Sequence, residues 1–216
     1  TWRTTLEGSS RYTHLITNGD IDRETNPDGV PVPVPGNSER MRITYVNPIP
    51  MPPYLFIVVA GTWDVLADSV TTCFGRTIRL EYLVPPGKTD GARLPMDILK
   101  DAVQWQAERL GYDYRRECYR TICMEKSNFG GMENVGNTTI ITEAALIDEW
   151  TPDRRLVYAF GVILHEFEHN HCGSDVTMET PFDMWLNEAF TVNIEREYLA
   201  DKFGTELMRL SDLDSM

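Results

Sequence analysis

The sequence predicts an α+β protein in which a β-rich N-terminal part is followed by a part that mixes helices and strands. Short β-like segments separated by proline and glycine turns fill residues 11 to 67. After the Pro-Pro-Gly at residues 85–87, apolar residues recur at helical spacing. A chain of 216 residues can form one or two hydrophobic cores, and we expect two parts, residues 1–67 and 68–216.

Strands are expected in the N-terminal part wherever β-branched and aromatic residues gather between turn signals. Residues 12–17, 41–46 and 54–60 have this character. Prolines alternate with valines over residues 31–35, which excludes a helix and fits an extended edge or connector. Residues 77–84 alternate between apolar and polar and predict one further strand.

The second part is expected to hold three helices and two more strands. Helical spacing of apolar residues predicts helices over residues 94–110, 156–171 and 182–199, the first of them ending at Gly111. The strands are expected over residues 119–124 and 138–142, on either side of a glycine-rich turn.

The composition excludes several classes of protein. A formal net charge of −13 argues against nucleic acid as a partner, because proteins that bind it concentrate Lys and Arg. The longest apolar run, residues 54–60, is far shorter than the ~20 residues of a membrane helix, so no membrane segment is expected. The four cysteines form no CxxC pair and are expected to be thiols, which favours a reducing compartment such as the cytoplasm.

A metal site is predicted by the HExxH pattern of residues 165–169, at the end of an expected helix. Positions i and i+4 of a helix lie about 40° apart, so His165 and His169 can bind the same Zn²⁺. Glu188 is the candidate third ligand, with 18 residues between it and His169. Glu166 is placed beside the metal as a general base for a zinc-activated water. We expect one zinc ion per chain.

Three residues near the motif leave alternatives open. Cys172 could be a ligand in place of Glu188 and close a structural zinc site, although Glu166 would then have no role. His171 lies off the ligand face and is expected to be an ordinary polar residue. Glu168 has no assigned role and is expected to face solvent.

A second motif, Gly130-Gly131-Met132-Glu133-Asn134, lies between two of the expected strands. The glycines allow another backbone to approach closely, as an extended peptide does when it adds to a sheet edge. Glu133 offers a negative charge to an ammonium group. By itself, the pattern fits a glycine-rich hairpin with an isolated carboxylate better than a functional site.

Taken together, GGMEN, HExxH and the glutamate of WLNEAF resemble the M1 family of zinc aminopeptidases. The segments at residues 53–56, 59–61, 64–66 and 176–177 resemble its aminopeptidase N branch. The resemblance implies that Glu133 anchors the free amine of a peptide and that Gly130, Gly131, Met132 and Asn134 hold its backbone. It places Phe129 at the floor of the pocket for the first substrate residue. Residues 1–67 would then be the end of an N-terminal β-sheet domain, and residues 68–216 the first part of a thermolysin-like catalytic domain.

The implied function is zinc-dependent hydrolysis of the N-terminal residue from peptides with a free N-terminus. The alternatives are a thermolysin-like endopeptidase and a non-catalytic zinc-binding fragment of M1 type. Members of the family are several times longer, and their transition-state tyrosine lies well downstream of the glutamate ligand, where Tyr198 does not match it. We therefore expect the remainder of a longer polypeptide to be required. His171, Ser174 and Asp175 also depart from the aromatic, Asn and often basic residues usual in the family.

Overall fold

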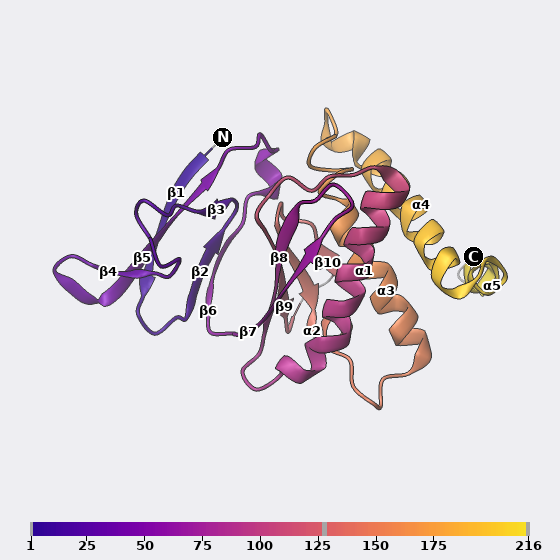
Figure 1. The fold of residues 1–216 in the computed structure, drawn as a ribbon, viewed down its shortest axis with the longest axis horizontal. Coiled ribbons are helices and arrows are strands. Elements are labelled where there is room, and N and C mark those ends of the chain that lie inside the picture. The colour runs from indigo at the N-terminus through magenta and orange to yellow at the C-terminus, as the bar shows by residue number, and fades with distance from the viewer. Residues whose placement is uncertain (1, 127–128, 215–216) are drawn as a thin grey trace.

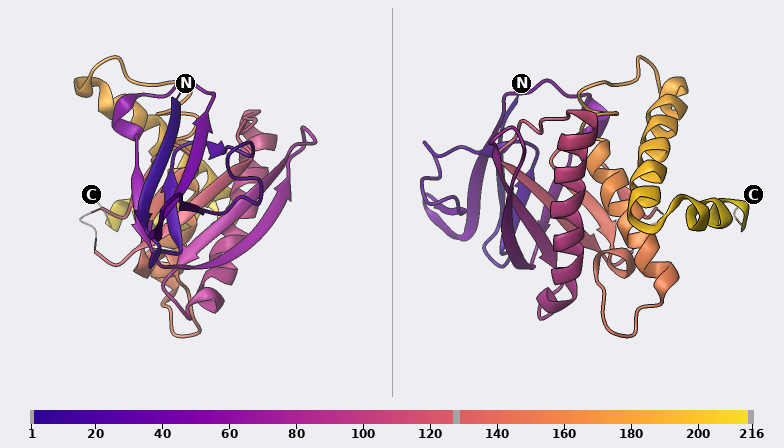
Figure 2. Two further views of the ribbon diagram at one scale, coloured as in Figure 1. Left: turned by 90° about the vertical axis from the view of Figure 1, so that its left-hand side faces the viewer. Right: turned by 45° about the vertical axis from the view of Figure 1, so that its right-hand side comes forward.

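The molecule has β strands at one end, a larger sheet in the middle and helices at the other end (Figure 1). The structure is a computed structural model, and it describes residues 2–126 and 129–214. Helices α1 and α3 lie against the middle sheet, and α5 projects away from the body of the molecule (Figure 2). Mixed strands and helices confirm the α+β class expected from the sequence.

The N-terminal part consists of two small antiparallel sheets. One is built on the long strand β5 (Asn37–Asn47), which pairs with β1 (Trp2–Ser9), β3 (Asp20–Ile21) and β4 (Val32–Val34). The other pairs β2 (His14–Thr17) with β6 (Val58–Gly61), and the short 3-10 helix η1 (Pro53–Leu55) precedes β6. The alternating prolines and valines form the short strand β4, in agreement with the extended connector or edge predicted there.

The middle sheet has five strands in the order β10-β11-β9-β8-β7. These are β7 (Asp64–Thr71), β8 (Thr77–Val84), β9 (Cys118–Met124), β10 (Gly131–Met132) and β11 (Asn137–Ile141). β9 is parallel to both β8 and β11, and the two outer pairs are antiparallel. The expected boundary between residues 67 and 68 falls inside β7, which pairs along its whole length with β8. The division into two domains stays a prediction.

The helices follow the expected pattern, with differences at their ends. They are η2 (Thr89–Ala92), α1 (Arg93–Leu110), α2 (Thr142–Ala145), α3 (Asp153–Glu168), η3 (Pro181–Asp183), α4 (Met184–Phe203) and α5 (Thr205–Asp214). The main core packs one face of the sheet, including Ile78 and Leu80, against α1 and α3, including Leu99 and Phe167. Burying each such side chain contributes about 1.5–3 kcal/mol, so this core fixes α3 on the sheet.

Asparagine side chains join the N-terminal part to the middle sheet. Asn18 donates to the carbonyl oxygens of Leu55 and Val135 at 3.1 and 3.0 Å, and Asn137 donates to that of Thr17 at 3.2 Å. Because these amides are buried and satisfied, they fix η1 beside the strand that carries the GGMEN motif. Among residues 2–126 and 129–214, no helix is both long and apolar enough to cross a membrane.

Candidate active site

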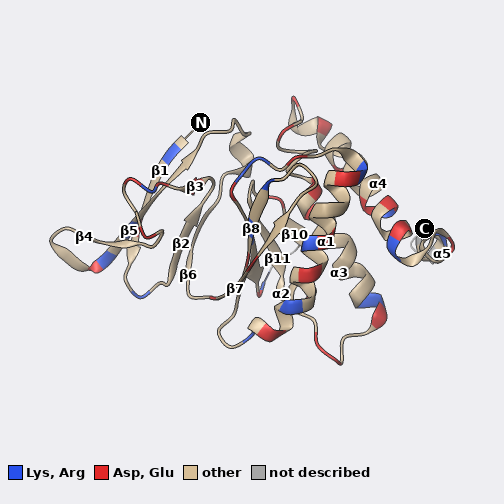
Figure 3. Cartoon of the chain, in the orientation of Figure 1, with Lys and Arg blue, Asp and Glu red and all other residues tan. Residues whose placement is uncertain are grey.

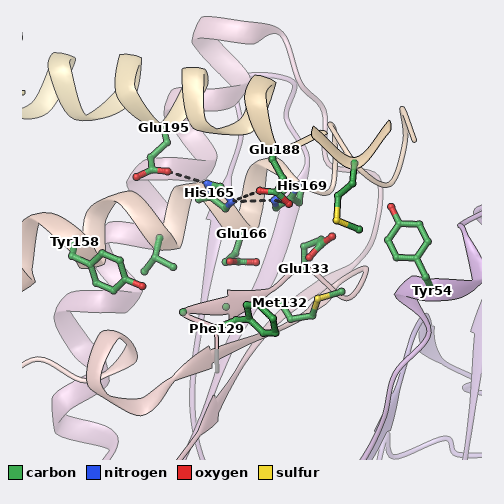
Figure 4. Close-up of a pocket in the computed structure, with 14 residues that line it drawn as sticks. Tyr54, Phe129, Met132, Glu133, Tyr158, His165, Glu166, His169, Glu188 and Glu195 are labelled. Carbon is green, nitrogen blue, oxygen red and sulfur yellow. Dashed lines mark hydrogen bonds and ion pairs between the residues drawn. The ribbon is translucent and has the colours of Figure 1, made fainter. Parts of the chain in front are cut away.

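Two helices bring the three predicted metal ligands together. His165 and His169 lie one turn apart at the C-terminal end of α3, and Glu188 lies in the second turn of α4, which crosses above them (Figure 4). The two Nε2 atoms are 3.1 Å apart. Glu188 approaches them to 3.4 Å from His165 and 3.7 Å from His169.

These three residues fit a zinc ion. Their ligand atoms all lie within 4.8 Å of one another. A set of two imidazoles and one carboxylate is typical of catalytic zinc, which keeps a fourth position for water or substrate. The helical i, i+4 spacing therefore gives the geometry expected from the sequence, while the roles of the residues stay predictions.

The outer nitrogen of each histidine is fixed by a hydrogen bond. Nδ1 of His165 lies 2.9 Å from a carboxylate oxygen of Glu195, and Nδ1 of His169 lies 2.9 Å from the carbonyl oxygen of Cys172. Both partners are acceptors, so each Nδ1 carries the proton and each Nε2 is left for the metal. Sequence reasoning missed Glu195, although it follows Glu188 by seven residues, or two helical turns, on the same face of α4.

Hydrogen bonds and burial shift the pKa values of these groups in different directions. Burial alone would lower the pKa of His165, but its bonds to Glu188 and Glu195 outweigh burial and raise the pKa to about 10. The hydrogen bonds of Glu188 with His165 and His169 lower the pKa of the Glu188 carboxyl well below its usual range. Without metal, the raised pKa favours a protonated His165 beside an ionised Glu188. A metal ion that binds at Nε2 of His165 must displace that proton.

Glu166 points away from the ligand triad toward β10 (Figure 4). Its side chain is buried, and burial raises its pKa to about 7. Gly131 leaves room for it, because a Cβ there would overlap Oε1 of Glu166. The space left by the two missing side chains is therefore occupied by side chains of α3. Gly131 contacts Glu166, and Gly130 contacts the hydroxyl of Tyr158.

The GGMEN segment contributes β10, an edge strand of the sheet formed by the described residues. β10 pairs with β11 on one side only, so its other side faces the pocket (Figure 4). The side chain of Glu133 points into this pocket, near Glu166 (Figure 4). Asn134 does not line it: its buried amide donates to the carbonyl of Leu55 at 3.4 Å and holds the segment in place.

The pocket has a volume of about 610 Å³. It is lined by the expected Phe129, Gly130, Gly131, Met132, Glu133, His165, Glu166, His169 and Glu188, and by Tyr54, Tyr158, Val162, Met184 and Glu195, which the sequence did not reveal. The side chain of Phe129 is 74% exposed at the rim. Tyr54 and Tyr158 lie on opposite sides of Glu166 (Figure 4).

The charge of the lining favours cations. It contains Glu133, Glu166, Glu188 and Glu195 and, among the described residues, neither Lys nor Arg. Asp and Glu also lie along α1, α3 and α4, interspersed with Lys and Arg (Figure 3). The negative electrostatic potential of this pocket attracts a metal ion or a substrate ammonium group.

For the residues near the motif, one expectation was wrong, and one alternative is not supported by the positions of the side chains. Glu168 does not face solvent: it is 0% exposed, because this side of α3 packs toward Tyr112 rather than outward. The thiol of Cys172 does not join His165 and His169, and the second group of potential metal ligands in the described chain is Glu168, His171 and Cys172.

Known proteins resemble this chain in sequence, and a solved structure resembles it in fold. Residues 94–214 match the peptidase family M1 domain. Aminopeptidase N of Caulobacter vibrioides is 32% identical over 98% of this chain and 24% of that protein. Aminopeptidase N of Escherichia coli is 33% identical over 95% of this chain and 23% of that protein. The crystal structure of Legionella pneumophila aminopeptidase A in complex with aspartic acid superposes with a TM-score of 0.89, at 26% identity, over 97% of this chain and 24% of that chain.

Proposed function

Because the chain belongs to peptidase family M1, we propose that it is part of a zinc-dependent aminopeptidase that removes the N-terminal residue from peptides with a free amine. The observation that carries this proposal is the position of Glu133. Its carboxylate shares one pocket with Glu166 and with His165, His169 and Glu188, beside an open strand edge.

Each group has a distinct part in the proposed reaction. His165, His169 and Glu188 would hold Zn²⁺, which would supply Lewis acidity for the scissile carbonyl and for a water molecule. Oε2 of Glu166, which has no hydrogen-bond partner among the described residues, accepts the proton of the attacking water and delivers it to the leaving nitrogen. Glu133 pairs with the substrate ammonium group, and the open side of β10 aligns the peptide backbone. Because Glu133 holds the substrate amine beside the metal site, the peptide bond that reaches the metal is the one after the first residue.

The chain spans about a quarter of the length of the curated relatives it matches, 24% and 23% for the two aminopeptidases N. We therefore propose the activity for the whole polypeptide. The expectation that additional residues complete the site, including a transition-state tyrosine, belongs to the same proposal.

The test is hydrolysis of an aminoacyl-p-nitroanilide by the full-length protein, abolished by a chelator and restored by Zn²⁺. Glu133→Gln should lower kcat/KM roughly 10- to 100-fold, because a charged hydrogen bond of about 1.5–3 kcal/mol is lost. Glu143→Gln is the matched control, since Glu143 is an exposed carboxylate outside the pocket. It should leave kcat/KM unchanged.

Two outcomes would reject the proposal. Cleavage of N-acetylated peptides at internal bonds, with Glu133→Gln as active as the parent, would identify a thermolysin-like endopeptidase. Zinc binding with no hydrolysis of either substrate class would identify a non-catalytic relative.

A further inference from the structure

A second set of metal-ligand side chains lies on the turn that follows α3. Glu168, His171 and Cys172 stand at positions i, i+3 and i+4, and the backbone amides of His171 and Cys172 both donate to the carbonyl of Glu168, at 2.7 and 3.0 Å. This helical turn places the three side chains on one face. One ligand atom from each lies within 4.8 Å of the other two, the same limit met by His165, His169 and Glu188.

The environment of the Glu168 carboxylate indicates that a positively charged ligand binds on this face. Its carboxylate is fully buried, and Oε2 has no hydrogen-bond partner among the described residues. A buried carboxylate oxygen without a partner is costly, so the charge needs a counterpart beyond the contacts of Glu168 with Nδ1 of His171, at 3.2 Å, and with the thiol of Cys172. The half-buried His171 and Cys172 leave a path to it from solvent.

The donor set selects the class of ligand. A thiolate, an imidazole and a carboxylate together suit Zn²⁺, whereas Ca²⁺ and Mg²⁺ prefer oxygen ligands only. Ligand atoms around a four-coordinate zinc lie roughly 3.2–3.8 Å apart, because each is about 2.0–2.3 Å from the ion. Nδ1 of His171 and the Glu168 carboxylate already have this spacing. The Sγ atom of Cys172 lies within 4.8 Å of both ligand atoms, so a small movement of its side chain would bring it to the same spacing.

We propose that Glu168, His171 and Cys172 form a second, thiolate-containing zinc site, separate from the site of His165, His169 and Glu188. Its role is structural. The carbonyl of Cys172 accepts the hydrogen bond from Nδ1 of His169, so an ion that fixes Cys172 also fixes the orientation of a ligand of the first site. The ring of Tyr112 stacks on His171, with centroids 4.8 Å apart, and holds that ligand from the other side.

Metal content and cobalt spectroscopy of the full-length protein test this proposal without any assay of activity. Native mass spectrometry of the zinc-loaded, reduced protein should count two ions per chain, and Cys172→Ser should count one. When Co²⁺ replaces Zn²⁺, a thiolate-to-cobalt absorption should appear in the near ultraviolet and disappear in Cys172→Ser. Cys73→Ser is the matched control, because Cys73 is an exposed free thiol elsewhere in the chain. It should keep both the second ion and the band.

A further variant separates this site from the proposed active site. His165→Ala removes a ligand of the first site only, so it should lose one ion and keep the thiolate band. The proposal is overturned if the parent protein binds a single ion, if the cobalt protein shows no thiolate band, or if the band survives in Cys172→Ser. None of these results bears on whether the protein hydrolyses aminoacyl substrates.

Discussion

Two glutamates of the pocket have opposite properties because their surroundings differ. Glu188 lies 3.4 and 3.7 Å from Nε2 of His165 and His169, and these contacts lower its pKa, so it stays ionised, as the predicted ligand role requires. Glu166 is buried beside β10, and burial raises its pKa to about 7, so it can take up and release a proton near neutral pH. Carboxylates whose pKa values are pushed apart in this way are suited to different roles.

Replacing Glu166 by Gln tests its role as the base. The change keeps the shape of the side chain and removes proton acceptance, so kcat should fall by about 10²- to 10⁴-fold while zinc remains bound. Stopped assays with an aminoacyl-p-nitroanilide and metal analysis of the same sample measure both quantities. Loss of zinc in Glu166→Gln would instead make this residue a determinant of metal binding.

Sequence reasoning finds the residues of the site that are spaced by a local rule. The HExxH spacing and the helix around Glu188 are enough to predict that His165, His169 and Glu188 lie together. Glu195 could have been found in the same way, from the two-turn spacing on α4. Tyr54 could not, because it reaches the pocket from η1, more than 70 residues before the next lining residue, through contacts that only the folded chain creates.

At the scale of elements, α4 carries both the predicted ligand Glu188 and Glu195, whose carboxylate contacts Nδ1 of the predicted ligand His165. Glu195→Ala should weaken zinc binding at the first site about 10- to 100-fold, because His165 loses the acceptor of its Nδ1 proton. Competition with a chromophoric chelator measures this affinity. Glu197→Ala, an exposed glutamate of the same helix, is the control and should bind zinc as the parent does. Equal affinities for the two variants would contradict the orienting role.

Gly161 gives an independent test of the same contact between α3 and α4. A Cβ at this position would lie 2.6 Å from Oε1 of Glu195, so Gly161→Ala should displace that carboxylate from His165. We expect the zinc affinity of Gly161→Ala to fall in the same direction as that of Glu195→Ala. Combining both changes should add little, because the second change removes a contact already lost. Additive losses in a double-mutant cycle would show that the two changes act separately.

An ion pair between neighbouring parallel strands stabilises the middle sheet. Nε of Arg120 on β9 lies 2.8 Å from Glu81 on β8, and their side chains are 8% and 14% exposed. Burial would raise the pKa of Glu81, but the charges of Arg120 and Arg79 outweigh it and lower the pKa below the ordinary 4.5. The stabilisation from this group is therefore present above about pH 4.5 and is lost as the pH falls through its lowered pKa.

Arg120→Met should lower the free energy of unfolding by about 3 kcal/mol at pH 7, because it leaves Glu81 buried with less compensation. The loss should become smaller near pH 4, where Glu81 of the variant is protonated. Arg79→Met is the control: this arginine is 62% exposed and its pair with Glu81 should contribute less than about 1 kcal/mol. Urea unfolding at the two pH values measures both variants, and a loss independent of pH would exclude the electrostatic explanation.

The strongly periodic elements were predicted, and the irregular ones were not. The residues expected as a strand at 77–84 are those of β8, and α1 begins one residue before the expected helix at 94–110. β7 was missed because most of its side chains are exposed at the sheet edge, which leaves little hydrophobic alternation to detect. β10 has only two residues and exists through pairing with β11, which no local pattern encodes.

At the scale of the whole molecule, the first half of α4 has its polar side inward. Asn187 and Thr191 are buried toward the site, whereas Trp185 and Phe190 on the same helix are 64% and 59% exposed. Phe182, in the preceding turn, is 90% exposed. Exposed aromatic side chains this close in the chain are candidates for contacts with another protein surface.

We expect the 216-residue chain by itself to associate through these side chains. Its mass, measured by light scattering after size-exclusion chromatography, should rise with concentration because association removes the exposed aromatic side chains from water. Replacing Trp185 and Phe190 together by Ser should shift the chain toward the monomer. Trp150→Ser is the matched control, since Trp150 is 81% exposed in the loop between α2 and α3. If this control reduces association as much as the double variant does, the contact lies elsewhere than on α4.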